Sequence, residues 1–274
     1  MAAAQRHILL TGATGGIGAA TAMALAVPGT RLTLVARNPE RLQQLADRLA
    51  QFCSGAAAVA ADLGNAEAAA EVVAQATAAQ GSVDVLVNCA GINDFGRFAK
   101  AAPARIEALI ATNLLAPVLL SRAVLPGMLA RGRGRIVNVG SVMGGVGFAG
   151  FGVYCATKFG LRGFSEALRR ELRGSGVSVA YVAPRYTRTA LNTAVMDRMA
   201  KAVRMNCDTP ETAAEAIVAA VHGTKADHVI GLVERLLVRV NGLLPGVMDI
   251  SLAGLNRRMA EHAELERHIA EGKV

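Results

Sequence analysis

Two side chains near the middle of the chain, Tyr154 and Lys158, have the types and spacing of an acid–base pair. They lie four residues apart, so a helix places both on one face. A phenol ordinarily loses its proton at about pH 10, and a fixed ammonium nearby favours the phenolate and lowers that pKa. The pair is therefore a potential proton donor and acceptor. The same spacing is common in surface pairs without a function, so the rest of the chain must decide between these interpretations.

A glycine-rich turn near the start of the chain favours a nucleotide-binding site. The apolar run Arg6–Thr11 predicts a buried strand, and an Ala-rich helix is predicted over Ala19–Val27. Between them, from position 11, stands T-G-A-T-G-G-I-G. Glycines let the backbone approach a pyrophosphate, and the helix N-terminus supplies free N–H groups and a positive dipole end. Many glycine turns are only turns, but the order strand, turn, helix favours phosphate binding here.

The ends of the next two strands predict contacts to the rest of such a nucleotide. Arg37 follows a strand predicted over Arg31–Ala36, and no acidic residue precedes it. An acidic side chain in this place binds the ribose 2′-hydroxyl of NAD, whereas an arginine accommodates a 2′-phosphate, so we expect NADP(H). Asp62 follows a strand predicted over Ala56–Ala61. It either accepts from the adenine amine or caps the helix expected from about Asn65.

Strands and helices alternate along the chain, which predicts an α/β fold: a doubly wound (Rossmann-type) seven-stranded parallel sheet flanked by helices. The remaining strands are expected over Val83–Asn88, Arg135–Val139, Val177–Ala183 and Ala226–Leu232, and the remaining helices over Pro39–Phe52, Ala104–Leu129, Tyr154–Arg173 and Pro210–His222. Pro117 and Pro126 are expected to interrupt the long helix. Five glycines between positions 144 and 152 are expected to leave that loop open and mobile. No linker or repeat is visible, so we expect residues 1–232 to form one catalytic domain and residues 233–274 to be an amphipathic helical extension of it.

Composition narrows the classes of partner. Of the 274 residues, 53% are hydrophobic and 18% charged, which excludes a disordered chain. The net charge of +8 favours anionic ligands or surfaces. The chain has no zinc-finger spacing, RNP-like aromatic motif or basic heptad, so no nucleic-acid partner is expected. The four cysteines have no metal-ligand spacing; we therefore expect no metal site and a reducing compartment.

Neither a targeting segment nor a membrane span is expected. The segment Met1–Arg6 lacks the apolar core of a signal peptide. No uncharged apolar run is long enough to cross a bilayer, and the nearest, Val229–Ile250, is interrupted by two arginines and two acidic residues. The simplest expectation is a cytoplasmic protein.

The motifs together resemble a short-chain dehydrogenase/reductase of the single-domain kind over about Arg6–Leu232. They stand in the family's order: Thr11-Gly12, Gly16 and Gly18, then Asp62, Asn88-Cys89-Ala90-Gly91, Asn113, Ser141, Tyr154, Lys158 and Pro184. The resemblance implies that Tyr154 exchanges a proton with the substrate oxygen and that Ser141 hydrogen-bonds this oxygen. It also implies that Lys158 holds the nicotinamide ribose and lowers the pKa of the tyrosine, and that Asn113 helps to hold a water that relays protons. The implied activity is NADPH-dependent reduction of a ketone, aldehyde or 3-oxoacyl carbonyl to an alcohol, or the reverse.

The resemblance also completes the expected cofactor contacts and shows two departures. The expected contacts are Thr11, Gly12, Thr14, Gly16, Ile17, Gly18, Arg37, Asp62, Leu63, Asn88, Ala90, Gly91, Tyr154, Lys158, Pro184, Thr187 and Thr189, the two threonines toward the carboxamide. Cys89 stands where the family often has a second asparagine. Arg185 replaces the glycine that usually follows the proline, and is expected to narrow the pocket or to contact an acidic substrate.

Four apolar residues at helical spacing, Met196, Met199, Val203 and Met205, predict either an ordinary surface helix or a lid over an apolar pocket. The lid suggests a small apolar carbonyl or alcohol substrate. An alternative is an NADP(H)-binding sensor or scaffold without turnover that contacts membranes peripherally. The complete set of Tyr, Lys, Ser and Asn favours the enzyme, since a sensor needs no acid–base groups.

Two surfaces are expected to be covered. The helices from Ala104 and from Tyr154 carry apolar residues on more than one side, so we expect a homodimer or homotetramer. In the tail, Leu232, Leu236, Val240, Leu243 and Leu244 form an apolar stripe. We expect the segment Val233–Leu255 to pack on the protein near the lid or a partner subunit and to help close an apolar pocket. Membrane contact through this segment is the less favoured alternative.

Overall fold

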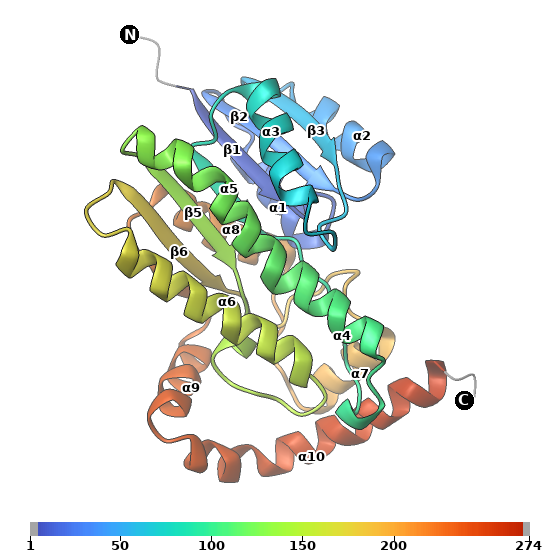
Figure 1. Ribbon diagram of the computed structural model, residues 1–274. Helices are drawn as coiled ribbons and strands as arrows, with labels where there is room; N and C mark the ends of the chain where they lie inside the picture. The colour runs from blue at the N-terminus through green and yellow to red at the C-terminus, as the bar shows by residue number, and fades with distance from the viewer. Residues whose placement is uncertain (1–4, 271–274) are drawn as a thin grey trace.

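A parallel sheet of seven strands forms the centre of the molecule in the computed structural model, which describes residues 5–270 (Figure 1). The strands are β1 (Arg6–Thr11), β2 (Thr30–Ala36), β3 (Gly55–Ala60), β4 (Val85–Asn88), β5 (Gly134–Val139), β6 (Val177–Ala183) and β7 (Asp227–Val229). They pair in the order β3-β2-β1-β4-β5-β6-β7, all parallel. The predicted doubly wound fold is therefore confirmed. The order reverses between β1 and β4, where such sheets bind ligands.

Helices cover both faces of the sheet. They are α1 (Gly16–Leu25), α2 (Pro39–Leu49), α3 (Ala68–Gln80), α4 (Pro103–Ile110), α5 (Ala116–Ala130), α6 (Gly152–Glu171), α7 (Ala194–Ala202), α8 (Pro210–His222), α9 (Leu232–Leu243) and α10 (Pro245–Ala270). On one face α1, α2 and α8 bury Leu25, Leu42 and Ile217. On the other, α3, α5 and α6 bury aliphatic side chains of their own. Strands covered on both faces explain the short, continuous apolar runs in the sequence.

The long helix after β4 is continuous, so the predicted interruption at Pro117 and Pro126 is wrong. A π turn, Ala111–Leu115, joins α4 directly to α5. Proline has no N–H for the carbonyl four residues earlier, and the wider π turn immediately before Pro117 accommodates this without ending the helix. Pro126 lies inside α5. This geometry matters for function because Asn113 lies in the π turn.

The same helix, Pro103–Ala130, is long and apolar enough to cross a membrane by length and composition alone, and it is the one such helix in the part of the chain that the structure describes. The sequence pointed instead to Val229–Ile250 as the nearest run. Leu120, Val124 and Met128 of the helix are buried against the sheet. Such packing is typical of a core helix.

The glycine-containing loop between β5 and α6 is packed rather than open. Ser141 begins a 3-10 turn, Val142–Gly144, and both Val142 and Val146 are buried against α9 and α10. The expectation of an open loop is therefore not met, because the C-terminal helices cover it.

The C-terminal extension exposes most of the apolar stripe that was expected to be buried, and buries other apolar residues instead. The seventh strand ends at Val229 rather than Leu232, and Leu232 begins α9. The inward-facing residues are Leu237, Val238, Met248, Leu252, Leu255 and Met259, which join buried clusters. Six apolar residues on the other side, Leu232, Leu236, Leu243, Leu244, Val247 and Ile250, are exposed, and we call them the outer apolar face. The segment does pack on the protein, as predicted, but four of the five stripe residues lie on the exposed side.

Candidate active site

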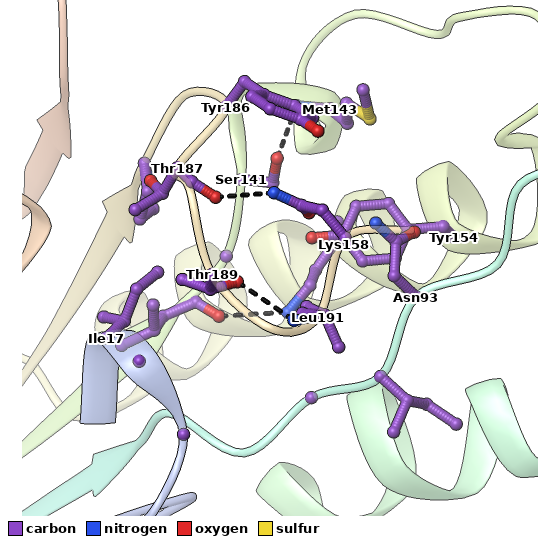
Figure 2. A pocket seen from close by; sticks show the side chains of 18 of the residues that line it. Ile17, Asn93, Ser141, Met143, Tyr154, Lys158, Tyr186, Thr187, Thr189 and Leu191 are labelled. Carbon is purple, nitrogen blue, oxygen red and sulfur yellow. Dashed lines mark hydrogen bonds between the residues drawn. The ribbon is translucent and has the colours of Figure 1, made fainter. Parts of the chain in front are cut away.

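A cavity of about 780 Å³ opens at the carboxyl ends of the strands. Loops after β1, β4, β5 and β6 form its walls, and α9 and α10 border one end. It brings together most of the residues predicted from sequence: Gly12, Thr14, Gly16, Ile17, Gly18, Arg37, Asp62, Leu63, Ala90, Gly91, Ser141, Tyr154, Lys158, Pro184, Thr187 and Thr189. Figure 2 shows Ser141, Tyr154 and Lys158 around the cavity, with Thr189 approaching the glycine turn at Gly16.

Tyr154 and Lys158 lie on one face of α6, and Ser141 reaches them from the end of β5. The Lys158 ammonium lies 5.6 Å from the centre of the Tyr154 ring and donates to the carbonyl of Val139 at 3.1 Å. Ser141 hydrogen-bonds the Tyr154 phenol. Lys158 is almost wholly buried, so its charge acts in a poorly screened environment. The three groups are therefore close enough together to act on one substrate oxygen.

The pKa of Tyr154 is raised, although the nearby Lys158 was expected to lower it. Burial raises it to about 12, and the hydrogen bond from Ser141 opposes only part of this rise. Burial also lowers the pKa of Lys158 to about 8. The lowering of the Tyr154 pKa by Lys158 that the spacing predicted is therefore not found: desolvation dominates, and the group that opposes it is Ser141. At neutral pH both groups carry their protons, which is the state required to donate one.

The glycine turn forms a cradle at the N-terminus of α1. Gly12 has a φ of +69°, and a Cβ there would stand 2.8 Å from the backbone of Ala90. A Cβ at Gly18 would meet the carbonyl oxygen of Gly12 at 2.0 Å. No side chain caps the first turn of α1, which carries no acidic residue. The open amides and the positive helix end therefore fit a phosphate group.

Two side chains outside the cradle also suit the predicted cofactor. Arg37 lines the cavity at the end of β2 and is exposed. Asp62 accepts from the N–H of Gly64 at 3.0 Å and does not cap α3, whose N-terminal residue is Ala68. The capping alternative is thus excluded, while the contact to adenine stays a prediction.

Three predicted site residues, Thr11, Asn88 and Asn113, do not line the cavity but hold its walls in place. Thr11 accepts from the N–H groups of Cys89 and Ala90 at 3.0 and 3.1 Å, joining the loops after β1 and β4. Asn88 donates to the side chain of Asn138 at 2.8 Å. Each is almost completely buried. Their contribution to the site is therefore positional.

Asn113 is likewise fully buried, in the π turn. Its side chain accepts from the N–H of Ile92 at 2.8 Å and donates to the Ile92 carbonyl at 2.9 Å and to Thr157 at 3.3 Å. It thus fastens the loop after β4 to the catalytic helix α6. Its predicted contact with a relay water stays a prediction.

Sequence analysis missed Tyr181, which positions both Ser141 and α6. Its hydroxyl accepts from the N–H of Ser141 at 3.3 Å and donates to the Ser141 carbonyl at 3.2 Å, and it lies 3.4 Å from the carbonyl oxygen of Lys158. The one signal was a tyrosine within an otherwise small and aliphatic strand, since a buried phenol needs a partner.

Arg185 lines the cavity, as expected, and also joins three segments of the protein; its contact with an acidic substrate stays a prediction. Its guanidinium pairs with both carboxylate oxygens of Asp208, at 2.8 and 2.7 Å, and lies 3.5 Å from Glu234. Asp208 ends the segment that contains α7 and precedes α8, residues 194–208, which we call the lid region; Glu234 lies in the first turn of α9. Asn206 also donates to Glu234 at 3.0 Å. The arginine thus connects the loop after β6, the lid region and the C-terminal helices.

Replacing Arg185 with glycine is expected to destabilise the fold and to raise KM. The change leaves two buried carboxylates without a cation, and because a quarter of the Arg185 side chain is exposed we expect a loss of about 2–3 kcal/mol, below the roughly 3–5 kcal/mol of fully buried pairs. Thermal unfolding and steady-state kinetics measure both effects. Arg188→Gly, at an exposed arginine in the same loop, is the control. Failure of Asp208→Asn plus Glu234→Gln to restore stability in the Arg185→Gly background would contradict this role.

The lid prediction is supported by the packing around α7. Met196 and Met199 are buried with Phe95, Phe151 and Met259. Met196, Val203 and Met205 also line the cavity. Leu237, Leu252 and Leu255 of the C-terminal helices add aliphatic lining. Apolar side chains of α7, α9 and α10 therefore line part of the cavity, beside polar ones such as Arg204 and Asn206.

Comparison with known proteins agrees with this geometry. A family profile described as short chain dehydrogenase matches residues 6–200. The chain is 32% identical to the ketoacyl reductase HetN of Nostoc sp. over 97% of its own length and 96% of the relative's. It is 37% identical to an acetoacetyl-CoA reductase of Acinetobacter sp. over 79% and 88% of the two chains. A short-chain dehydrogenase of Sphingobium yanoikuyae, solved in complex with NADPH, superposes with a TM-score of 0.74 at 29% identity, covering 89% of this chain and 95% of that one.

Proposed function

This chain belongs to the short-chain dehydrogenase/reductase family, and from that premise we propose that it is an NADPH-dependent reductase that converts a carbonyl to an alcohol. The observation that carries the proposal is the convergence of Ser141, Tyr154 and Lys158 on one cavity that also contains the phosphate cradle. Relatives named as ketoacyl and acetoacetyl-CoA reductases support the direction of reaction.

The residues of the site perform the proton chemistry. Tyr154 donates its phenolic proton to the substrate oxygen as that oxygen gains negative charge, and Ser141 donates a hydrogen bond to the same atom. The Lys158 ammonium stabilises the phenolate left behind. A pKa of about 12 keeps Tyr154 protonated at neutral pH, which favours reduction over the reverse reaction. Tyr181 and Asn113 keep Ser141 and α6 in place.

The cofactor would be held by the cradle of Gly12, Gly16 and Gly18, by Arg37 at the 2′-phosphate, and by Thr187 and Thr189 near the carboxamide. NADPH, when bound, supplies the hydride. Neighbouring structures solved with NADPH and NADP support this choice.

Replacing Arg37 with aspartate is expected to lower the affinity for NADPH by about 10–100-fold and to narrow or reverse the preference over NADH, since a charge-assisted bond to phosphate is lost and repulsion replaces it. Fluorescence titration with both cofactors measures this. Arg48→Asp makes the same change of charge at the far end of α2, outside the cavity, and should leave both affinities unchanged. Equal binding of NADH and NADPH by the unaltered protein would refute the role of Arg37.

Single-turnover oxidation of NADPH with a panel of ketones, aldehydes and 3-oxoacyl thioesters tests the function itself. We expect turnover with apolar carbonyls, because Met196, Met205 and Leu237 contribute apolar side chains to the cavity wall. Tight NADPH binding without oxidation of the cofactor on any carbonyl would favour the alternative of a cofactor-binding sensor. Arg185, which departs from the family pattern, makes ion pairs within the protein to Asp208 and Glu234.

We further propose that the protein is a homodimer or homotetramer assembled through α4, α5 and α6. Ile110 of α4, Leu115 of the π turn before α5 and Phe159 of α6 are 40–45% exposed, although other sides of the same helices are buried. Light scattering at micromolar concentration should give a multiple of 28.3 kDa, and Phe159→Asp should reduce it. A monomeric unaltered protein would exclude this assembly.

Residues 1–232 would form the NADP-binding catalytic domain, and residues 233–274 would extend it. The free thiols of the four cysteines support a cytoplasmic location.

A further inference from the structure

The helical hairpin of α9 and α10 presents apolar residues on two opposite sides. Its inner side, including Val238 and Met248, is buried against the loop after β5. The six residues of the outer apolar face, defined above, are between 49% and 81% exposed. A helix that is apolar on two sides must bury both to be stable in water. Figure 1 shows the turn between α9 and α10 projecting at the lower left of the molecule, away from the sheet.

The outer apolar face is a cluster and not a chance scatter. Seven of the sixteen exposed large hydrophobic residues that the structure describes, the six of this face and Val233, fall within the short stretch from Leu232 to Ile250. Every residue from Gly242 to Val247, around the turn, is exposed. Single exposed hydrophobic residues are ordinary, but a contiguous patch marks an interaction surface.

Basic side chains accompany this face. Arg239 is exposed and lies three residues after Leu236 and four before Leu243, on the same side of α9. Arg257 and Arg258 are exposed two turns after Ile250 on α10. Asp249 and Glu261 are the exposed acidic residues nearby, whereas Glu234 is turned inward toward Arg185. With a chain charge of +8, this pattern matches helices that lie on anionic lipid.

A second copy of the chain fits this surface less well. A two-fold contact buries the same residues of both subunits, so the Arg239 guanidinium group of each would be taken out of water within a mostly apolar interface. Asp249 is the one exposed acidic side chain between Leu232 and Ile250, the stretch that contains the outer apolar face. A buried, unpaired guanidinium is costly, whereas at a lipid surface the arginine extends to the headgroups while its methylene groups stay among apolar neighbours. We propose that the outer apolar face docks on an anionic lipid surface.

Docking would place the cavity beside the lipid. Val233, exposed next to Leu232, lines the cavity, as do Leu237 and Leu255 of the same hairpin. Entry of a lipid-soluble carbonyl by this route rests on the proposed function. The docking itself does not, and vesicle binding tests it independently of turnover.

The first experiment is co-sedimentation of the full-length protein with vesicles of phosphatidylcholine alone or mixed with phosphatidylglycerol. We expect binding to the mixed vesicles, weaker binding to phosphatidylcholine alone, and a decrease as salt is raised. Leu243→Ser combined with Ile250→Ser should lower the partition coefficient at least about tenfold, since two apolar side chains no longer leave water. Phe52→Ser, at an exposed apolar residue outside the hairpin, should leave binding unchanged.

The chain contains no tryptophan, so a single introduced one reports its own surroundings. Leu243→Trp should give a blue-shifted emission on addition of the mixed vesicles, whereas Phe52→Trp should give no shift. Circular dichroism and thermal unfolding check that each variant is folded. An unshifted Leu243→Trp signal, or equal sedimentation of the unaltered protein and the double serine variant, would overturn the proposal. So would light scattering showing that the double serine change dissociates an oligomer in the absence of vesicles, which would assign the face to self-association.

Discussion

Tyr154→Phe is expected to lower kcat for carbonyl reduction by about 10²–10⁴-fold while leaving the affinity for NADPH nearly unchanged. The substitution removes the transferable proton and keeps the ring, which packs edge-on against Phe151 with 6.4 Å between ring centres. Burial holds the pKa of the phenol at about 12, so the proton is present throughout the neutral range, and the substitution removes it together with the hydrogen bond to Ser141. Single-turnover NADPH oxidation and cofactor titration measure the two quantities separately.

Tyr186→Phe is the matched control for this prediction. Tyr186 also lines the cavity, but its hydroxyl pairs with Asp197 at 2.7 Å and not with Ser141. The loss of turnover should be much smaller than for Tyr154→Phe. A comparable loss in both variants, or substantial turnover in Tyr154→Phe, would mean that the Tyr154 phenol is not the proton donor.

Lys158→Ala is expected to lower kcat/KM by about 10²–10³-fold, because the charge that stabilises the phenolate is removed from a poorly screened site. It should also weaken NADPH binding, since the lysine is expected to hold the nicotinamide ribose. Lys158→Met separates charge from volume. Turnover near that of the unaltered enzyme in the methionine variant would show that the ammonium is dispensable.

The same lysine predicts the pH profile. Burial lowers the pKa of Lys158 to about 8, so the ammonium is present below that pH and is lost as the pH rises through it. We expect kcat/KM for reduction to fall above about pH 8 in the unaltered enzyme. Tyr154 cannot produce this limb, because it keeps its proton to about pH 12. The limb should disappear in Lys158→Met, and its persistence there would assign it to another group.

Local sequence determined much of the frame. The apolar runs of β1 and β6 were predicted to the residue, and the Asn38 cap of α2 and the Thr209 cap of α8 stand where the sequence indicated helix starts. These features depend on neighbours in the chain: alternation of buried runs with turns, side chains that accept the first free N–H groups, and prolines in first turns. The spacing of Tyr154 and Lys158 follows in the same way from the pitch of one helix.

Tertiary structure decided what those residues face. The pKa values of Tyr154 and Lys158 reflect desolvation by distant elements, which no local spacing reports. Arg185 could be recognised as a departure, but its partners Asp208 and Glu234 are 23 and 49 residues away and meet it only in the fold. The tail is the clearest case. Periodicity identified an apolar stripe, yet a helix with apolar residues on both sides carries no local signal for which side is buried, and packing against Val142 and Val146 made that choice.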